Sequence, residues 1–151
     1  MQRKSVLIAL IIGLSATIAF ADLEPWKDYE VSDAVWAVTT VKVDPNMGDA
    51  YLEGIAQTWA ASNEVAKGLG QIEEYAIYRS DLPQSGDFNL LLVVKFAKTE
   101  DLAPNKARYE AFMAKWGEER QKASTEKAQR DYPGMRNITG QYNFRKIELK
   151  K

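Results

Sequence analysis

Apolar and polar positions along the chain change their spacing several times, and each change marks a new structural element. Residues 35–43 (VWAVTTVKV) are rich in β-branched and aromatic side chains, which predicts a strand. After Asp44 and Pro45, apolar residues recur at helical spacing until the glycines Gly68 and Gly70. The first part of the chain is therefore predicted to be a strand followed by an amphipathic helix.

Two further strands are predicted in the middle of the chain. Residues 72–79 (IEEYAIYR) and 88–97 (FNLLLVVKFA) carry strand-forming side chains, and the turn-forming stretch 80–87 separates them. Positions 90–94 are continuously apolar, which is typical of a strand that is buried on both faces. Helices of the same chain can cover one face, so the other face needs a cover of its own.

The C-terminal third predicts a second helix and a last strand. Residues 104–129 show one helical pattern, about 39 Å long if unbroken, with an apolar stripe that fades beyond Trp116. Residues 138–149 (ITGQYNFRKIEL) alternate like a strand. Their alternation changes phase between Phe144 and Ile147, which indicates a bulge or a bend.

The resulting order of elements, β-α-β-β-α-β, is that of ferredoxin-like domains. It predicts an α+β fold in which two right-handed crossovers lay both helices on one face of a four-stranded antiparallel sheet. The second face would then be bare, although residues 90–94 are apolar toward both faces. A homodimer that packs two sheets face to face would cover it, so we expect a homodimer.

On this element order, the apolar third strand and the tryptophan-bearing first helix, residues 35–149 resemble the dimeric α+β barrel superfamily of small ferredoxin-like proteins. Its members include cofactor-independent monooxygenases, haem-degrading enzymes and small-molecule isomerases. Haem-handling members commonly use a histidine ligand, and this chain has no histidine. The resemblance therefore implies the fold and the dimer, and it leaves several functions open.

The first 21 residues read as a secretory signal peptide. A positively charged start with Arg3 and Lys4 precedes an almost unbroken apolar run over 6–18 and a small-x-small cleavage pattern. The apolar run is shorter than the roughly 20 residues that a membrane-spanning helix needs, so we expect no stable membrane anchor. We expect a periplasmic or secreted protein whose mature form begins at Asp22.

After the signal peptide, the chain divides into an arm and one domain. Residues 22–34 are polar, contain proline and lack periodicity, which predicts an N-terminal arm, and residues 35–151 hold the predicted strands and helices. Trp26 and Tyr29 are unusual in such an arm. They either lie loosely on the surface or dock onto the domain or a partner.

Composition and charge narrow the chemistry. The chain has a formal net charge of −1 at pH 7, so it lacks the basic excess that nucleic-acid binding requires, and we expect no nucleic-acid partner. Cysteine and histidine are both absent, which excludes disulfides, thiolate or imidazole catalysis and the usual zinc ligands. No acidic loop has the spacing of a Ca²⁺ or Mg²⁺ site. We therefore expect no metal and no cofactor.

Five side chains are candidates for a ligand site, namely Trp59, Tyr75, Asn89, Trp116 and Arg145. The two tryptophans lie on apolar helix stripes, where they either fill the core or line a cavity between helices and sheet. Tyr75 is either a core tyrosine with a partner for its hydroxyl or a ligand contact. Asn89 either satisfies backbone groups at the start of a strand or orients a ligand.

The arginines near the last strand, Arg136 and Arg145, have two interpretations. Either could clamp a carboxylate ligand, because guanidinium groups bind carboxylates with paired hydrogen bonds. The alternative is an ion pair with an acidic side chain such as Glu73 or Glu74. Only a structure distinguishes these interpretations.

The sequence leads to two hypotheses of function. The first is an exported protein that binds a small apolar or aromatic ligand or has an accessory role. The second is a cofactor-independent enzyme, similar to the monooxygenases or isomerases of the superfamily, that acts on an aromatic or polyketide-like substrate. A cavity that gathers polar side chains favours binding or catalysis, and a space filled by Trp59 and Trp116 favours an inert core.

Overall fold

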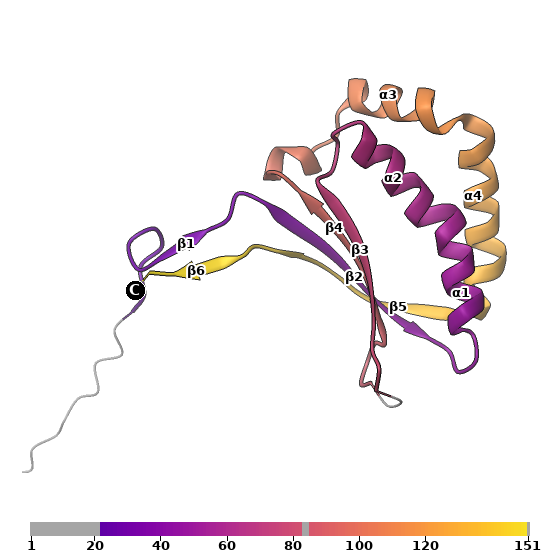
Figure 1. Ribbon diagram of the computed structural model, residues 1–151, viewed down its shortest axis with the longest axis horizontal. Helices are drawn as coiled ribbons and strands as arrows, with labels where there is room; N and C mark the ends of the chain where they lie inside the picture. Colours follow the sequence, from indigo (N-terminus) through magenta and orange to yellow (C-terminus); the bar gives the residue numbers. More distant parts are fainter. Residues whose placement is uncertain (1–21, 83–84, 151) are drawn as a thin grey trace, which may run out of the picture.

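A four-stranded antiparallel sheet forms one layer of the structure, and helices cover one of its faces (Figure 1). The computed structural model describes residues 22–82 and 85–150, so the predicted signal peptide lies outside the described residues. The strands are β2 (Val35–Val43), β3 (Glu74–Arg79), β4 (Leu90–Phe96) and β5 (Arg136–Phe144), in the spatial order β3-β4-β2-β5. With the intervening helices, this order confirms the predicted α+β ferredoxin-like fold.

The first helical segment is one rod with a local irregularity. Helices α1 (Gly48–Ile55) and α2 (Ala61–Gly68) are joined by a π-helical turn, η1 (Ala56–Ala60). The predicted helix is therefore confirmed, but periodicity did not reveal the π turn. Such turns are rare and frequently occur at functional sites.

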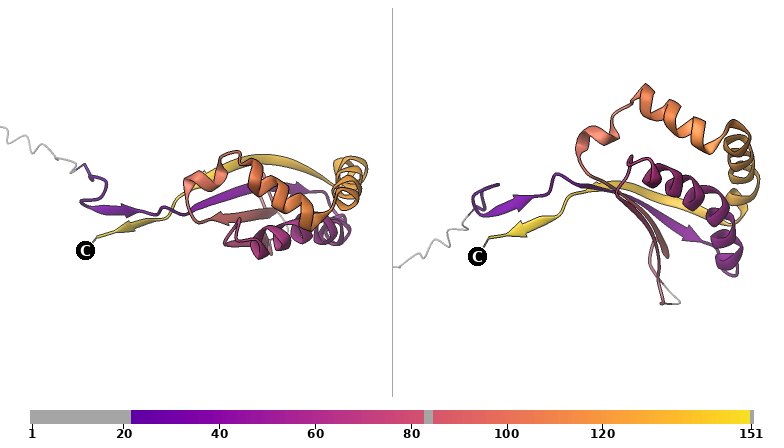
Figure 2. Two further views of the ribbon diagram at one scale, coloured as in Figure 1. Left: turned by 90° about the horizontal axis from the view of Figure 1, so that it is seen from above. Right: turned by 45° about the horizontal axis from the view of Figure 1, so that its top comes forward.

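The second predicted helix, 104–129, is wrong as a continuous element. Helix α3 (Lys106–Trp116) ends at Gly117, and helix α4 (Glu118–Asp131) begins directly after it. Gly117 has φ +90° and ψ 141°, which lies outside the helical region. Glycine adopts such a conformation more easily than any other residue. The two helices therefore turn a corner, with α3 against α2 and α4 against η1 (Figures 1 and 2).

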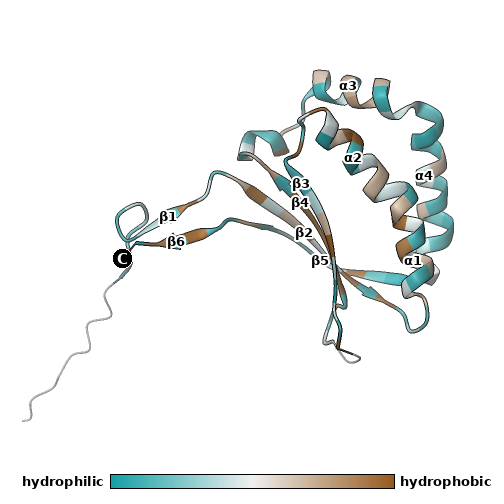
Figure 3. Cartoon of the chain, in the orientation of Figure 1, coloured by the Kyte–Doolittle hydropathy of each residue, from teal (hydrophilic) through white to brown (hydrophobic). Residues whose placement is uncertain are grey.

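The covered face of the sheet carries the hydrophobic core. Full burial of an aliphatic or aromatic side chain contributes roughly 1.5–3 kcal/mol, so this cluster stabilises the fold. Helix α4 contributes little to it, since none of its residues is fully buried and it is mostly hydrophilic (Figure 3). The buried members come from β2, α1, β4 and the short turn η3 (Tyr132–Gly134): Val41, Val43, Tyr51, Ile55, Leu90, Leu92 and Tyr132.

The other face of the sheet, here called the open face, is covered by no described element (Figure 1). Strand register places apolar side chains in rows across it; Val38, for example, lies opposite both Val93 and Tyr142. Tyr142 and Phe144 stack on each other and remain 50% and 52% exposed. The apolar side chains of the open face are Trp36, Val38, Ala76, Tyr78, Leu91, Val93, Tyr142 and Phe144.

The predicted last strand, 138–149, is two strands. β5 ends at Phe144 and β6 (Ile147–Leu149) follows, so the phase change in the sequence corresponds to a break between them. A β-bulge also occurs inside β5, because Gly140 pairs with Thr40 and Ile138 pairs with Val41.

A two-stranded ribbon projects from the sheet (Figures 1 and 2). It pairs β1 (Tyr29–Val31), from the segment predicted as an arm, with β6. The ribbon thus ties both ends of the described chain together, while Trp26 at its tip is 69% exposed. Across residues 22–82 and 85–150, none of the helices combines the length and hydrophobicity needed to cross a membrane.

Candidate functional site

A cleft of about 410 Å³ lies between the π turn and helix α4, and we call it the interhelical cleft. Its walls come from η1, α2, the last residue of α3, one side of α4 and the first residue of β5. A second hollow of about 370 Å³ shares Thr58, Trp116 and Ser124 with it. The lining of the interhelical cleft is Thr58, Ser62, Trp116, Gln121, Ser124, Thr125, Ala128, Gln129 and Arg136.

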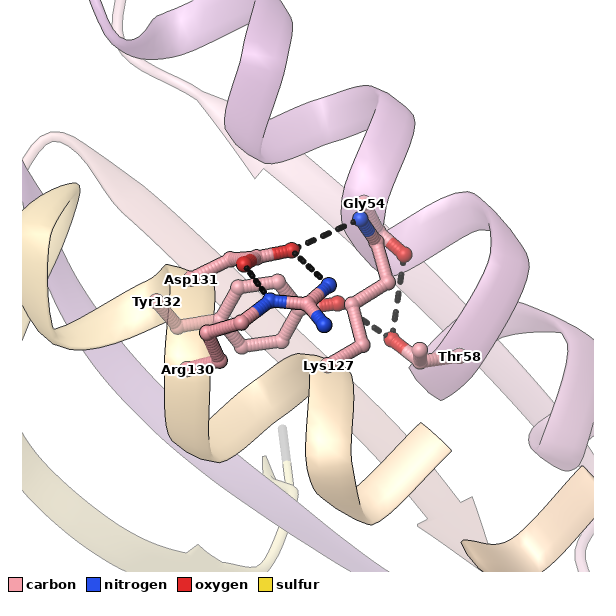
Figure 4. Close-up of polar contacts among 6 residues, drawn as sticks. All are labelled: Gly54, Thr58, Lys127, Arg130, Asp131 and Tyr132. Atoms are coloured by element: carbon pink, nitrogen blue, oxygen red, sulfur yellow. Dashed lines mark hydrogen bonds and ion pairs between the residues drawn. The ribbon is translucent and has the colours of Figure 1, made fainter. Parts of the chain in front are cut away.

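Two local features of the chain create this cleft. The glycine corner after α3 leaves Trp116 only 4% exposed and directs α4 back along the first helical rod. The π turn carries Thr58, whose Oγ1 donates to the carbonyl of Gly54 (3.1 Å) and accepts from the hydroxyl of Tyr132 (2.6 Å; Figure 4). A Cβ on Gly54 would lie 2.9 Å from Cε1 of Tyr132, so glycine permits this close approach.

Ion pairs hold the C-terminal end of α4 in place (Figure 4). The carboxylate of Asp131 accepts from Nε of Arg130 at 2.7 Å and from Nζ of Lys127 at 3.0 Å. The hydrogen bond from Arg130, followed by that from Lys127, lowers the pKa of Asp131 to about 2. Both cations thus share one carboxylate, and no ion pair joins Asp131 to Arg136 among the described residues.

Two buried N–H groups of the cleft lining have no hydrogen-bond acceptor. They are Nε1 of Trp116 and Nε of Arg136, and no other buried side-chain nitrogen or oxygen in the described part of the chain is unpaired. A buried polar group that lacks a partner costs about 1–3 kcal/mol, and native proteins leave few of them. Because both N–H groups line the same cleft, this cleft lacks the hydrogen-bond acceptors that would satisfy them.

Arg136 brings a positive charge to the cleft. Its guanidinium lies 5.8 Å from the ring centre of Tyr132, and it forms no ion pair among residues 22–82 and 85–150. Burial raises the pKa of the nearby Tyr51, although hydrogen bonding to Arg136 and its charge lower it. Tyr51 is therefore a neutral neighbour and leaves the charge of Arg136 uncompensated.

The structure does not bring the five predicted site residues together. Trp59 and Tyr75 form an edge-to-face pair with ring centres 5.6 Å apart, and the hydroxyl of Tyr75 donates to Glu64 at 3.0 Å. Burial, followed by this hydrogen bond, raises the pKa of Tyr75. These two residues connect the first helical rod to β3, in agreement with the core interpretation.

Asn89 and Arg145 have structural contacts of their own. Both ends of the Asn89 amide bind the backbone of Val43 at 2.8 Å, so Asn89 extends the pairing of β4 with β2. Arg145 donates to the carbonyls of Ser32 (2.9 Å) and Asp33 (3.1 Å) at the base of the ribbon. Of the five predicted residues, only Trp116 lines the interhelical cleft.

Sequence reasoning missed the polar wall of α4. Gln121, Ser124, Thr125 and Ala128 recur at helical spacing and therefore share one side of the helix. Their uncharged side chains interrupt an otherwise charged sequence, and this stripe is the signal that could have identified the wall. Thr58 carried no comparable signal, because its role depends on the π turn.

Another hollow of about 410 Å³, at the end of the sheet near the β3–β4 connection, has a different character. Lys42 donates there to the carbonyls of Ser85 (2.7 Å) and Gly86 (2.8 Å), and Asn89 is paired as described. These polar groups already have partners. No group of three or more acidic side chains within the described ranges is arranged to hold a metal ion.

Comparisons with known proteins concern the fold. No family model matches the chain, and no curated protein is significantly similar to it. A NIPSNAP family protein from Agrobacterium tumefaciens is 18% identical, with 82% of this chain and 95% of that chain covered and a TM-score of 0.48. A dimeric protein of ferredoxin-like fold from Bacteroides fragilis is 9% identical, with 80% and 100% covered and a TM-score of 0.42.

HapK from Hahella chejuensis is a third similar structure, 12% identical over 73% of this chain and 90% of that chain, with a TM-score of 0.44. All three TM-scores are below 0.5, so the fold assignment rests on the strand order and connections of the chain itself. In this sense the chain resembles ferredoxin-like proteins, as the sequence predicts.

Proposed function

We propose that this protein binds a small organic molecule in the interhelical cleft. The supporting observation is that the buried N–H groups of Trp116 and Arg136 both belong to its lining and both lack an acceptor. An acceptor from outside the chain would complete the site. The volume of about 410 Å³ suits such a ligand, because small-molecule sites commonly measure about 300–1,000 Å³.

The lining favours binding over the alternative of a cofactor-independent enzyme. Hydroxyl, amide, indole and guanidinium groups orient a ligand through hydrogen bonds. A base that takes a proton from a substrate would need a different kind of group, and the lining of the cleft contains no carboxylate. The hydroxyl of Tyr132, outside the lining, already donates to Thr58.

We also propose that the protein acts as a homodimer joined through the open face. The eight apolar side chains of this face form one surface across four strands, and Tyr78, Tyr142 and Phe144 are each at least half exposed. Soluble monomers seldom leave so contiguous an apolar surface in water.

Residues 1–21 support export to the periplasm or the medium as a further part of this proposal.

Nuclear magnetic resonance of the ¹⁵N-labelled protein tests the binding site. Its four tryptophans give four indole N–H signals, and Trp116→Phe identifies the signal of Trp116 by removing it. We expect 1-naphthoate or 1-naphthamide, two flat acceptors of matched shape, to shift this signal. Trp26 at the tip of the ribbon is the internal control, and its signal should stay in place. If neither probe moves the Trp116 signal at millimolar concentration, the cleft is not a binding site of this type.

A further inference from the structure

We infer that the ligand of the interhelical cleft is an organic anion whose carboxylate binds Arg136 and Trp116. This inference rests on the proposed function and specifies the chemical class of the ligand. A neutral carbonyl compound and a carboxylate would both accept hydrogen bonds from these residues. The distribution of charge around the cleft favours the carboxylate.

The cleft is positive although the chain as a whole is slightly acidic, with 21 acidic and 20 basic residues. The lining of the cleft and of the adjoining hollow contains Arg120, Lys127 and Arg136 but no Asp or Glu. Helix α4 has acidic residues, but none of them belongs to either lining; the nearest, Asp131, lies one turn beyond Lys127 and is paired with it. The residues of α4 that line the cleft and the adjoining hollow are therefore all neutral or positive.

Arg136 supplies the positive charge that is least compensated. Lys127 has Asp131 as its partner at 3.0 Å, and Arg120, which is exposed, lies over the Trp116 ring, 5.6 Å from its centre. Arg136 is half-buried with aromatic neighbours and no carboxylate. A partly desolvated cation is costly unless it is paired, so an anion has more to gain here than a neutral acceptor.

A bound water molecule would not complete the site in the same way. Water could accept from the indole N–H of Trp116, but it would leave the charge of Arg136 without a counter-ion. A carboxylate has two acceptor oxygens and a negative charge, and hydrogen bonds to charged groups are about twice as strong as neutral ones. The apolar side chains of Trp116 and Ala128 can contact an apolar body attached to that carboxylate.

The experiment compares two probes that share the naphthalene ring and a carbonyl oxygen but differ in charge, because an amide replaces the carboxylate. Titration of the protein with 1-naphthoate and with 1-naphthamide, followed through the indole signal of Trp116, gives two dissociation constants. We expect naphthoate to bind at least about tenfold more tightly. Equal affinities would overturn the anion inference and leave the binding site intact, whereas the absence of binding by both would contradict the proposed function itself.

Two variants separate a local effect of Arg136 from a general effect of charge. Arg136→Gln keeps an amide donor and removes the charge, and it should weaken naphthoate about tenfold or more while leaving naphthamide nearly unchanged. Lys122→Gln removes one positive charge from an exposed position of α4 outside both linings and should change neither affinity. Equal weakening by the two variants would show that naphthoate responds to net charge and would contradict a specific site at Arg136.

Discussion

The open face of the sheet and the interhelical cleft are both incomplete within one chain, and they lack different things. The open face offers apolar side chains that already have their backbone hydrogen bonds in the sheet, so it lacks an apolar cover. The cleft offers two buried N–H groups and a positive charge, so it lacks an acceptor. The first deficit suits another protein surface, and the second suits a small anion.

A second comparison, between the two faces of β4, shows how the sheet divides its roles. Leu90 and Leu92 are 3% and 8% exposed under the helices, whereas Leu91 and Val93 point to the open face and are only partly buried. Aliphatic residues thus have different neighbours depending on which face of the strand their side chains point to, because successive side chains alternate between the two faces. Variants that alter one face at a time can test this division.

The largest effect is expected for Leu92→Asp. This change places a carboxylate among Val41, Ile77 and the other core residues, where it has no cation to pair with. The cost of an unpaired buried charge exceeds about 4 kcal/mol, enough to unfold an ordinary small domain. Circular dichroism should show no cooperative unfolding transition. A variant that melts like the wild-type protein would contradict the position of the core.

A smaller loss of stability is expected for Gly54→Ala. This variant tests the packing of the first helical rod against the turn after α4. The added Cβ would meet Cε1 of Tyr132 at 2.9 Å and displace its hydroxyl from Thr58. Overpacking of this kind costs about 1–3 kcal/mol. Denaturant unfolding measures the change in free energy.

Gly68→Ala is the matched control for this prediction. Gly68 ends α2 and has no atom within 4 Å of an added Cβ. The same substitution should therefore be neutral or stabilise by about 0.4–1 kcal/mol, because it reduces the freedom of the unfolded chain. Equal effects of the two variants would show that Tyr132 does not approach Gly54 as closely as described.

The smallest effect concerns how the stability of the fold changes at acidic pH. The folded state lowers the pKa of Asp131 from 3.8 to about 2, so the unfolded chain takes up this proton at higher pH than the folded one. Its contribution to stability is therefore present above about pH 4 and is lost as the pH falls toward 2. Asp131→Asn should melt at a temperature that depends less on pH in this window, as measured by thermal unfolding between pH 2 and 5. Parallel curves for the two proteins would contradict the pairing of Asp131 with Arg130 and Lys127.

The sequence predicted the elements that depend on local patterns. Strand alternation and the apolar run at 90–94 identified β2 and β4, because side-chain parity and burial follow directly from the residue types. The pattern of 104–129 did not reveal the corner at Gly117, since a glycine within a helical pattern does not by itself end a helix. The π turn was missed for a similar reason, because residues on both sides keep helical periodicity.

The candidate site was harder to predict than the fold, because it depends on contacts between distant residues. Trp116 was selected for its place on an apolar stripe, but its neighbours Thr58 and Arg136 come from other elements. The corner at Gly117 and the π turn together bring these three residues to one cleft. Asn89 shows the converse, since a polar residue at a strand start suggested a ligand contact and instead binds the backbone of Val43.

The proposal that a second copy of this chain covers the open face is tested most directly by the mass of the protein in solution. Multi-angle light scattering at micromolar concentration should give twice the mass of one chain for the wild-type protein. Leu91→Asp, which adds a charge to the open face and leaves the covered face unchanged, should give a folded protein with the mass of one chain. A wild-type protein that has the mass of a single chain at this concentration would contradict the account.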